Sequence, residues 1–361
     1  MASATRPIVL ITGVTGKVGG AVAKGLGDAY QIVGIDEHAS HTAFPVIEAD
    51  LTKDVAVAHA LDAFRDAHGA HIASVIHLAA YFDFTGADNP LYQRLNVDGT
   101  RRLLEQLQRF QVEQFVYSGT MLVHAPVEPG EHIDENRRLD PQWAYPKSKA
   151  AAERVIETCH GGIPYLLFHL AGVYDDETLV PTMAHQVARI HERDLESHVY
   201  PGNLATGQSM VHLDDLAAAF RLAVDKRASL PPATTILIGE PDPPGYGELQ
   251  DRLGELIHGE EWTTIRVPAT LAAAGAWVQD KVMPHLPKSL GGGKPFIRPF
   301  MALEAGDHYA LDITRARDLL GWAPKHRLLD TLPEIVARLK RDPKAWYEAN
   351  ELEPPPEVAG S

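Results

Sequence analysis

The stretch PIVLITGVTGKVGG at residues 7–20 decides the fold. A short apolar run, typical of a buried strand, leads directly into a loop with three glycines, and a helix-period segment follows. In this pattern Gly13 permits a tight turn, Gly16 lets a pyrophosphate approach the backbone, and Gly19 allows close contact between helix and strand. The N–H groups at the start of the helix can bind phosphate. The stretch therefore predicts a dinucleotide-binding strand, loop and helix.

The same alternation continues to about residue 170. Apolar runs stand at 31–35, 45–49, 74–80, 114–118 and 164–170, with helices expected near 17–28, 53–67, 90–110 and 141–160. Such alternation predicts an α/β fold, a Rossmann-type doubly wound parallel sheet. We expect a dinucleotide-binding core at 1–170 and a smaller, mainly C-terminal α/β substrate-binding region at 171–350, some of whose segments return to the core. A flexible tail is expected at 351–361.

The end of the second predicted strand indicates the cofactor. Asp36 stands where a carboxylate accepts hydrogen bonds from the adenosine ribose of a dinucleotide. Asp36 and Glu37 would repel a 2′-phosphate, and no arginine follows nearby. The sequence therefore favours NAD over NADP.

Composition excludes several classes of protein. The 361 residues include 45% hydrophobic ones, close to the globular average, and no apolar run reaches the roughly 18 residues of a membrane span. We therefore expect a cytoplasmic protein. A formal charge of −15 argues against nucleic acid as a partner, and the single Cys159 rules out an internal disulfide or a cysteine-pair metal site. His191 and His198 are expected to face solvent, so no metal site is predicted.

A tyrosine and a lysine further along the chain are the candidate acid/base pair. Tyr145 and Lys149 are four residues apart and share one helical face, on a helix that Asp140 and Pro141 are expected to open as N-cap and first residue. A tyrosine acting as a base near neutral pH needs its pKa lowered by roughly three units, about 4 kcal/mol. Lys149 and a cationic nicotinamide could supply that stabilisation. The predicted strand end at 117–120 adds hydroxyl groups at the edge of the sheet where ligands bind.

Taken together, the motifs resemble the extended short-chain dehydrogenases/reductases of the NAD-dependent epimerase/dehydratase family. They are TGVTGKVG (12–19), Asp36, Asp50-Leu51, HLAAY (77–81), NVDGT (96–100), YSGT (117–120), YPKSK (145–149), GVY (172–174), VHLDDLA (211–217) and LGWAP (320–324). The resemblance implies an enzyme that is a homodimer.

By this resemblance Thr120 hydrogen-bonds the substrate oxygen while Tyr145 takes or returns its proton. Asp50 and Leu51 would lie by the adenine, and Ala79 and Ala80 by the pyrophosphate and nicotinamide ribose. The expected cofactor site comprises Gly13, Thr15, Gly16, Lys17, Val18, Gly19, Asp36, Asp50, Leu51, Ala79, Ala80, Ser118, Tyr145 and Lys149.

One departure from the family pattern bears on the substrate. Many nucleotide-sugar members carry Arg-Pro-x-Asn, whose Asn contacts the nucleotide, whereas this sequence has His169-Leu170-Ala171-Gly172. Residues 267–322 resemble the 3β-hydroxysteroid dehydrogenase-like branch, and their apolar segment 271–283 could line an apolar pocket or lie on a membrane surface.

These observations predict an NAD-dependent oxidoreductase that interconverts a secondary alcohol and a ketone on a hydrophobic or mid-sized small-molecule substrate. The alternative is a nucleotide-sugar epimerase or dehydratase that retains its NAD. A non-catalytic dinucleotide sensor ranks last, because the sequence keeps the Tyr145/Lys149 pair. Asp214 and Asp215 are interpreted as a helix cap.

Overall fold

The computed structural model describes residues 6–39, 42–83, 87–268 and 305–359. Its centre is a parallel sheet of seven strands in the order β12-β8-β7-β5-β1-β2-β3. The strands are β1 (Ile8–Thr12), β2 (Gln31–Asp36), β3 (Val46–Glu48), β5 (Ser74–His77), β7 (Phe115–Thr120), β8 (Tyr165–Leu170) and β12 (Ala233–Ile238). The predicted α/β fold with a doubly wound parallel sheet is confirmed.

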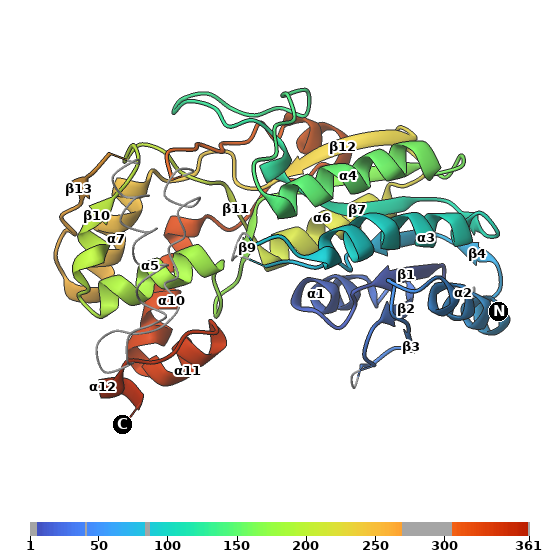
Figure 1. The fold of residues 1–361 in the computed structure, drawn as a ribbon, viewed down its shortest axis with the longest axis horizontal. Helices are drawn as coiled ribbons and strands as arrows, with labels where there is room; N and C mark the ends of the chain where they lie inside the picture. Colours follow the sequence, from blue (N-terminus) through green and yellow to red (C-terminus); the bar gives the residue numbers. More distant parts are fainter. Residues whose placement is uncertain (1–5, 40–41, 84–86, 269–304, 360–361) are drawn as a thin grey trace.

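Helices cover both faces of this sheet (Figure 1). One layer contains α1 (Lys17–Leu26) and α6 (Leu213–Asp225), and the other contains α2 (Asp54–His68), α3 (Asp98–Leu107) and α4 (Ala144–Cys159). The pleat of β1 explains the division, because Val9 and Ile11 join the core under α1 and α6 while Leu10 joins the core under the other three helices. A π-helical turn, η1 (Tyr92–Val97), leads into α3.

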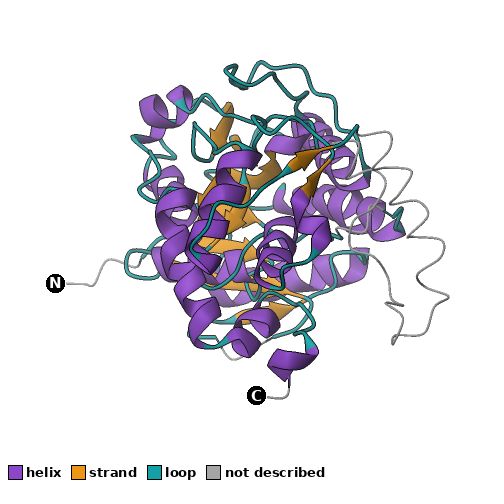
Figure 2. Ribbon diagram, turned by 90° about the vertical axis from the view of Figure 1, so that its left-hand side faces the viewer, coloured by secondary structure: helices purple, strands orange, loops and turns teal. Residues whose placement is uncertain are grey.

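A second lobe lies beyond the carboxyl ends of the strands, and Figure 2 shows the molecule turned toward it. It contains α5 (Pro181–His191), α7 (Tyr246–His258), α10 (Leu328–Arg341), α11 (Pro343–Ala349) and α12 (Pro356–Ala359). Two short parallel pairs accompany them, β10 (Val199–Tyr200) with β13 (Ile265–Arg266) and β9 (Gly172–Tyr174) with β11 (Met210–His212). A third pair, β4 (His71–Ile72) with β6 (Gln111–Val112), belongs to the first lobe.

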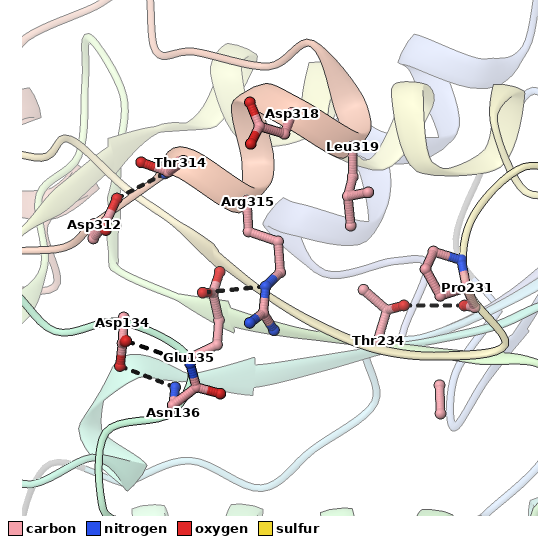
Figure 3. A pocket seen from close by; sticks show the side chains of 11 residues that line it. Asp134, Glu135, Asn136, Pro231, Thr234, Asp312, Thr314, Arg315, Asp318 and Leu319 are labelled. Carbon is pink, nitrogen blue, oxygen red and sulfur yellow. Dashed lines mark hydrogen bonds and ion pairs between the residues drawn. The ribbon is translucent and has the colours of Figure 1, made fainter.

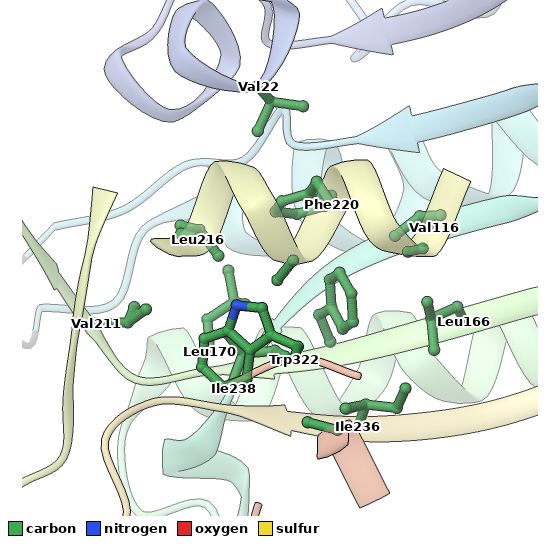
Figure 4. Packing of buried hydrophobic residues seen from close by; sticks show 14 of the residues in the cluster. Val22, Val116, Leu166, Leu170, Val211, Leu216, Phe220, Ile236, Ile238 and Trp322 are labelled. Atoms are coloured by element: carbon green, nitrogen blue, oxygen red, sulfur yellow. The ribbon is translucent and has the colours of Figure 1, made fainter. Parts of the chain in front are cut away.

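The chain crosses between the two lobes more than once. After β9 and α5 it returns through α6 and β12, which pairs with β8 along six residues. Trp322 returns again from the C-terminal part and is buried with Phe220 and Ile236 (Figure 4). Its indole N–H donates to the backbone oxygen of Asp215, which ties the C-terminal segment to α6. The apolar segment 271–283 lies outside the described residues.

Two predicted helix caps are wrong. The helix with the tyrosine and lysine begins at Ala144, with Trp143 at the N-cap. Asp140 is held away from the helix, because its backbone N–H bonds to Val123 and its carboxylate pairs with Arg138 at 2.8 Å.

The cap of α6 is His212, whose ring accepts the Asp214 N–H. Asp215 is buried instead, and its carboxylate accepts the backbone N–H groups of Lys325 and His326.

Candidate active site

The glycine-rich loop joins β1 to α1 at the carboxyl edge of the sheet. Gly13 adopts φ +70°, and a Cβ there would lie 2.7 Å from the backbone nitrogen of Ala79. A Cβ on Gly19 would lie 2.2 Å from the carbonyl oxygen of Gly13. Both positions therefore require glycine for packing alone. The helix begins at Lys17 with no side-chain cap on its N-terminus, so its first N–H groups can receive an oxyanion.

Asp36 lies at the end of β2, beside this loop. Its Oδ2 accepts the backbone N–H of Thr15 at 2.9 Å and the Thr15 hydroxyl at 2.8 Å, while its Oδ1 accepts the N–H of Glu37. Two donors therefore occupy Oδ2, while Oδ1 keeps one lone pair for a further donor. The structure thus brings together the loop and the acid that the sequence pattern paired.

The other residues expected around the cofactor differ in their surroundings. Asp50 shapes the turn before α2, because Oδ1 accepts both the hydroxyl and the N–H of Thr52, and these bonds lower the pKa of Asp50 to about 2. Leu51 is buried under α2 and α3. Ala79 lies against Gly13, and Ala80 lines the cavity described below.

The tyrosine and lysine occupy the first two turns of α4. Lys149 is 2% exposed, and its Nζ donates to the backbone oxygen of Ser118 at 2.7 Å. The same Nζ lies 4.8 Å from the ring centre of Tyr117 and 5.8 Å from that of Tyr145. Thr120 ends β7 and accepts the N–H of Leu122.

Burial dominates the electrostatics of this pair. It lowers the pKa of Lys149 to about 8 and raises that of Tyr145 above its ordinary value. The pKa of Tyr145 therefore lies further from neutral than that of a free tyrosine, whereas a tyrosine base near neutral pH needs a lower one. A cationic nicotinamide beside the phenol would shift this pKa downward.

The buried amide of Asn96 links α4 to the segment after β5. The side chain of Asn96 accepts the N–H of Tyr81 at 2.7 Å and donates to its carbonyl oxygen and to the Ser148 hydroxyl. Asn96 therefore links the segment after β5 to the helix that carries Tyr145 and Lys149, which is a structural role.

Sequence reasoning missed a buried polar network next to this pair. Glu153, one turn after Lys149, lies 3.2 Å from the ring of His169, and His169 is hydrogen-bonded to His124 at 2.7 Å. All three side chains are buried. The spacing of Lys149 and Glu153 on one helical face was a usable signal, whereas the two histidines meet only in the folded chain.

A cavity of about 780 Å³ opens beside these groups, between the two lobes. Its lining includes Lys17, Val18, Ser118, Thr120, Tyr145 and Lys149 from the first lobe. Apolar side chains also line it, among them Leu170, Val180, Met183 and Met210. The predicted acid/base pair and the phosphate-binding loop therefore face one shared space.

A second hollow, of about 480 Å³, lies away from this site near the amino end of β12 (Figure 3). Its polar side chains partner one another, with Arg315 against Glu135 and Asp134 against Asn136. It holds no group from the predicted site.

Metal ligation was not predicted, and the two histidines that were considered lie in separate elements. His191 ends α5 and His198 ends the 3-10 turn η3 (Leu195–His198). Within the described part of the chain, His212, Asp214 and His326 bring ligand atoms within 4.8 Å of one another.

Among the helices that the structure describes, none is both long and apolar enough to cross a membrane.

Comparisons with known proteins point to one group. The model of the NAD dependent epimerase/dehydratase family matches residues 9–239. A dTDP-glucose 4,6-dehydratase of Streptomyces niveus is 25% identical over 88% of this chain and 80% of its own length. A 3β-hydroxysteroid dehydrogenase/Δ5→4-isomerase of Mycobacterium tuberculosis is 25% identical over 96% of both chains. A short-chain dehydrogenase/reductase from Agrobacterium tumefaciens, solved with bound NAD, superposes with TM-score 0.69 at 20% identity, over 94% of this chain and 99% of its own.

Proposed function

The chain belongs to the NAD-dependent epimerase/dehydratase family, and from that premise we propose that it interconverts a secondary alcohol and a ketone on a largely apolar substrate. Family membership confirms three predictions from the sequence: the family itself, an enzyme of the extended short-chain dehydrogenase/reductase type, and NAD as the cofactor. The assignments of individual residues and of the substrate are proposals.

The first lobe fits NAD along the predicted residues. The uncapped start of α1, at Lys17 and Val18, suits the pyrophosphate, and the lone pair that Oδ1 of Asp36 keeps suits the adenosine ribose. Lys149 and Ser118 would hold the nicotinamide ribose. Both the N-terminus of α1 and Lys149 line the same cavity, which supports a single extended ligand.

NAD, when bound, accepts or returns the hydride, and the protein's own groups handle the proton. The Tyr145 hydroxyl is the acid/base for the substrate oxygen, and the Thr120 hydroxyl is the second hydrogen-bond partner of that oxygen. Lys149 stabilises the phenolate by its charge. Because burial lowers the pKa of Lys149 to about 8, the lysine loses its charge above that pH, and this stabilisation weakens in alkaline solution.

The packing at Gly172 carries the proposal of an apolar substrate. A Cβ at this position would lie 2.5 Å from the sulfur of Met210, so the thioether fills the space into which a side chain at position 172 would project. In the resembling nucleotide-sugar enzymes that position is the asparagine that contacts the nucleotide. Here an apolar group of Met210 takes its place and lines the cavity.

A nucleotide-sugar epimerase or dehydratase with retained NAD is the second candidate. The similarity to a dTDP-glucose 4,6-dehydratase over 88% of this chain favours it. Such an enzyme would show no net NADH at 340 nm, whereas the oxidoreductase we propose would.

The predicted homodimer is a separate proposal, which sedimentation would test.

A melting series with NAD saturating distinguishes the two candidates. A ligand raises the folded state's stability by RT ln(1 + [L]/Kd), so occupancy appears as a shift in Tm. Hydrophobic secondary alcohols should add to the shift from NAD, while UDP and dTDP should add little. A large, saturable shift with UDP or dTDP would reverse the choice.

A further inference from the structure

The cavity between the lobes has a second polar end. Opposite the tyrosine and lysine, its lining includes Arg189 in the last turn of α5, Tyr200 in β10, Tyr246 at the start of α7, and Asp307. Figure 1 shows α5, α7 and β10 on the far side of β9 and β11 from α4. β11, which carries the cavity residue Met210, lies between these elements and α4 in Figure 1.

Arg189 is a cation with no ion-pair partner among the residues that the structure describes. Its Nε is buried and has no hydrogen-bond partner, and no carboxylate of the described residues lies within ion-pair distance of it. The carboxylate of Glu192, the C-cap of α5, is close enough to feel the charge of Arg189 but accepts its hydrogen bond from the hydroxyl of Tyr347, at 2.6 Å. A guanidinium cannot lose its proton, so a half-buried one that lacks an anion is costly for the protein to keep.

Two stacked tyrosine rings lie next to Arg189. Tyr246 lies beside the guanidinium and stacks on Tyr200, with ring centres 3.5 Å apart and planes 13° apart. On the Tyr200 side, burial raises the pKa of Asp307 to about 6. The far end therefore presents the guanidinium of Arg189, two phenol rings, and two acids, Glu196 and Asp307.

We propose that Arg189 binds a single carboxylate at the far end of an otherwise apolar substrate, whose alcohol or ketone lies at Tyr145. This inference rests on the proposed function. The planar fork of Arg189 matches a carboxylate through two parallel hydrogen bonds. A diphosphate would bring at least two charges to one guanidinium and would also meet Asp307, so the charge balance favours the smaller anion.

The test compares acids with their methyl esters. We would use 3-oxo-5β-cholan-24-oic acid and 12-oxo-octadecanoic acid, each against its ester, with NADH saturating, and measure Kd and the oxidation of NADH. At least one acid should bind roughly 10- to 100-fold more tightly than its ester, the value of a charge-assisted hydrogen-bond pair.

Variants assign that preference to Arg189. The ratio of ester Kd to acid Kd should fall to near one in Arg189→Gln and be partly kept in Arg189→Lys. Arg193→Gln is the matched control, because Arg193 follows α5 but is exposed and pairs with Glu260 at 2.9 Å, and it should keep the wild-type ratio.

Failure of this inference differs from failure of the proposed function. Esters that are reduced as well as their acids would overturn the carboxylate site and leave the oxidoreductase standing. A preference for acids that survives Arg189→Gln would also overturn the site. If no member of the panel binds or oxidises NADH, both the site and the apolar substrate are refuted.

Discussion

Replacing Lys149 by methionine should remove a stability cost that the site imposes on the fold. Lys149 is 2% exposed, and burial lowers its pKa from 10.5 to about 8. That shift corresponds to about 3 kcal/mol of unfolding free energy. Because the pKa is lower in the folded chain, the unfolded chain binds the proton more readily between pH 8 and 10.5, and stability rises with pH across that window. Below pH 8 the full cost is present.

The measurement is urea unfolding of the cofactor-free protein at pH 7 and at pH 9.5. From pH 7 to pH 9.5 the unfolding free energy of the wild type should rise by about 2 kcal/mol more than that of Lys149→Met. The contributions of the other titrating groups cancel in this difference. Loss of the hydrogen bond to Ser118 offsets part of the variant's advantage at pH 7 but leaves this trend. Lys147→Met, an exposed change on the same helix, is the control and should show no such trend. A difference between Lys149→Met and wild type that is flat with pH would refute the reasoning.

Three other outcomes are expected. Tyr145→Phe should lower turnover by roughly a hundredfold to ten-thousandfold while NAD affinity changes little, which steady-state kinetics and NAD titration would check; near-normal turnover would contradict the acid/base role. Asp36→Ala should weaken NAD binding by about 1–3 kcal/mol and relax selection against NADP, and calorimetry with both cofactors measures this; a wild type that prefers NADP would contradict it. Gly19→Ala should destabilise the fold by about 1–3 kcal/mol in urea unfolding, because the added Cβ would overlap the backbone of Gly13 and Val14. A Cβ at Gly20 would have no atom within 4 Å, so Gly20→Ala should be neutral or stabilising. Equal effects at the two glycines would be inconsistent with this packing.

Local signals in the sequence were sufficient for the sheet and for the glycine-rich loop. The apolar runs predicted six of the seven strands of the main sheet. The glycine spacing predicted the tight turn at Gly13, where φ is +70°, and the close backbone contact at Gly19. The four-residue spacing of Tyr145 and Lys149 placed both side chains in the first two turns of one helix. These features depend on neighbours along the chain, which is why pattern and propensity can find them.

What the sequence did not predict depends on distant contacts. Asp140 resembles an N-cap, but a backbone bond to Val123 holds it outside the helix. Asp215 resembles a cap, but its carboxylate binds a segment 110 residues away. Arg189 has no motif around it, and its buried Nε, which has no hydrogen-bond partner among the described residues, is visible only in the folded chain. Tertiary contacts overrode local preference at each of these residues.

The interleaving of the two lobes has a consequence for how the chain folds during synthesis. β8 is completed at Leu170, yet its outer neighbour β12 is made roughly 70 residues later, an interval of several seconds at about 5–20 residues per second. During that interval the nascent chain exposes an apolar sheet edge, of the kind that templates aggregation. The edge closes when β12 pairs with β8, and Trp322 docks on α6 later still. A ribosome-bound fragment ending near residue 200 should therefore need a chaperone to stay in solution, while one that extends past Trp322 should not.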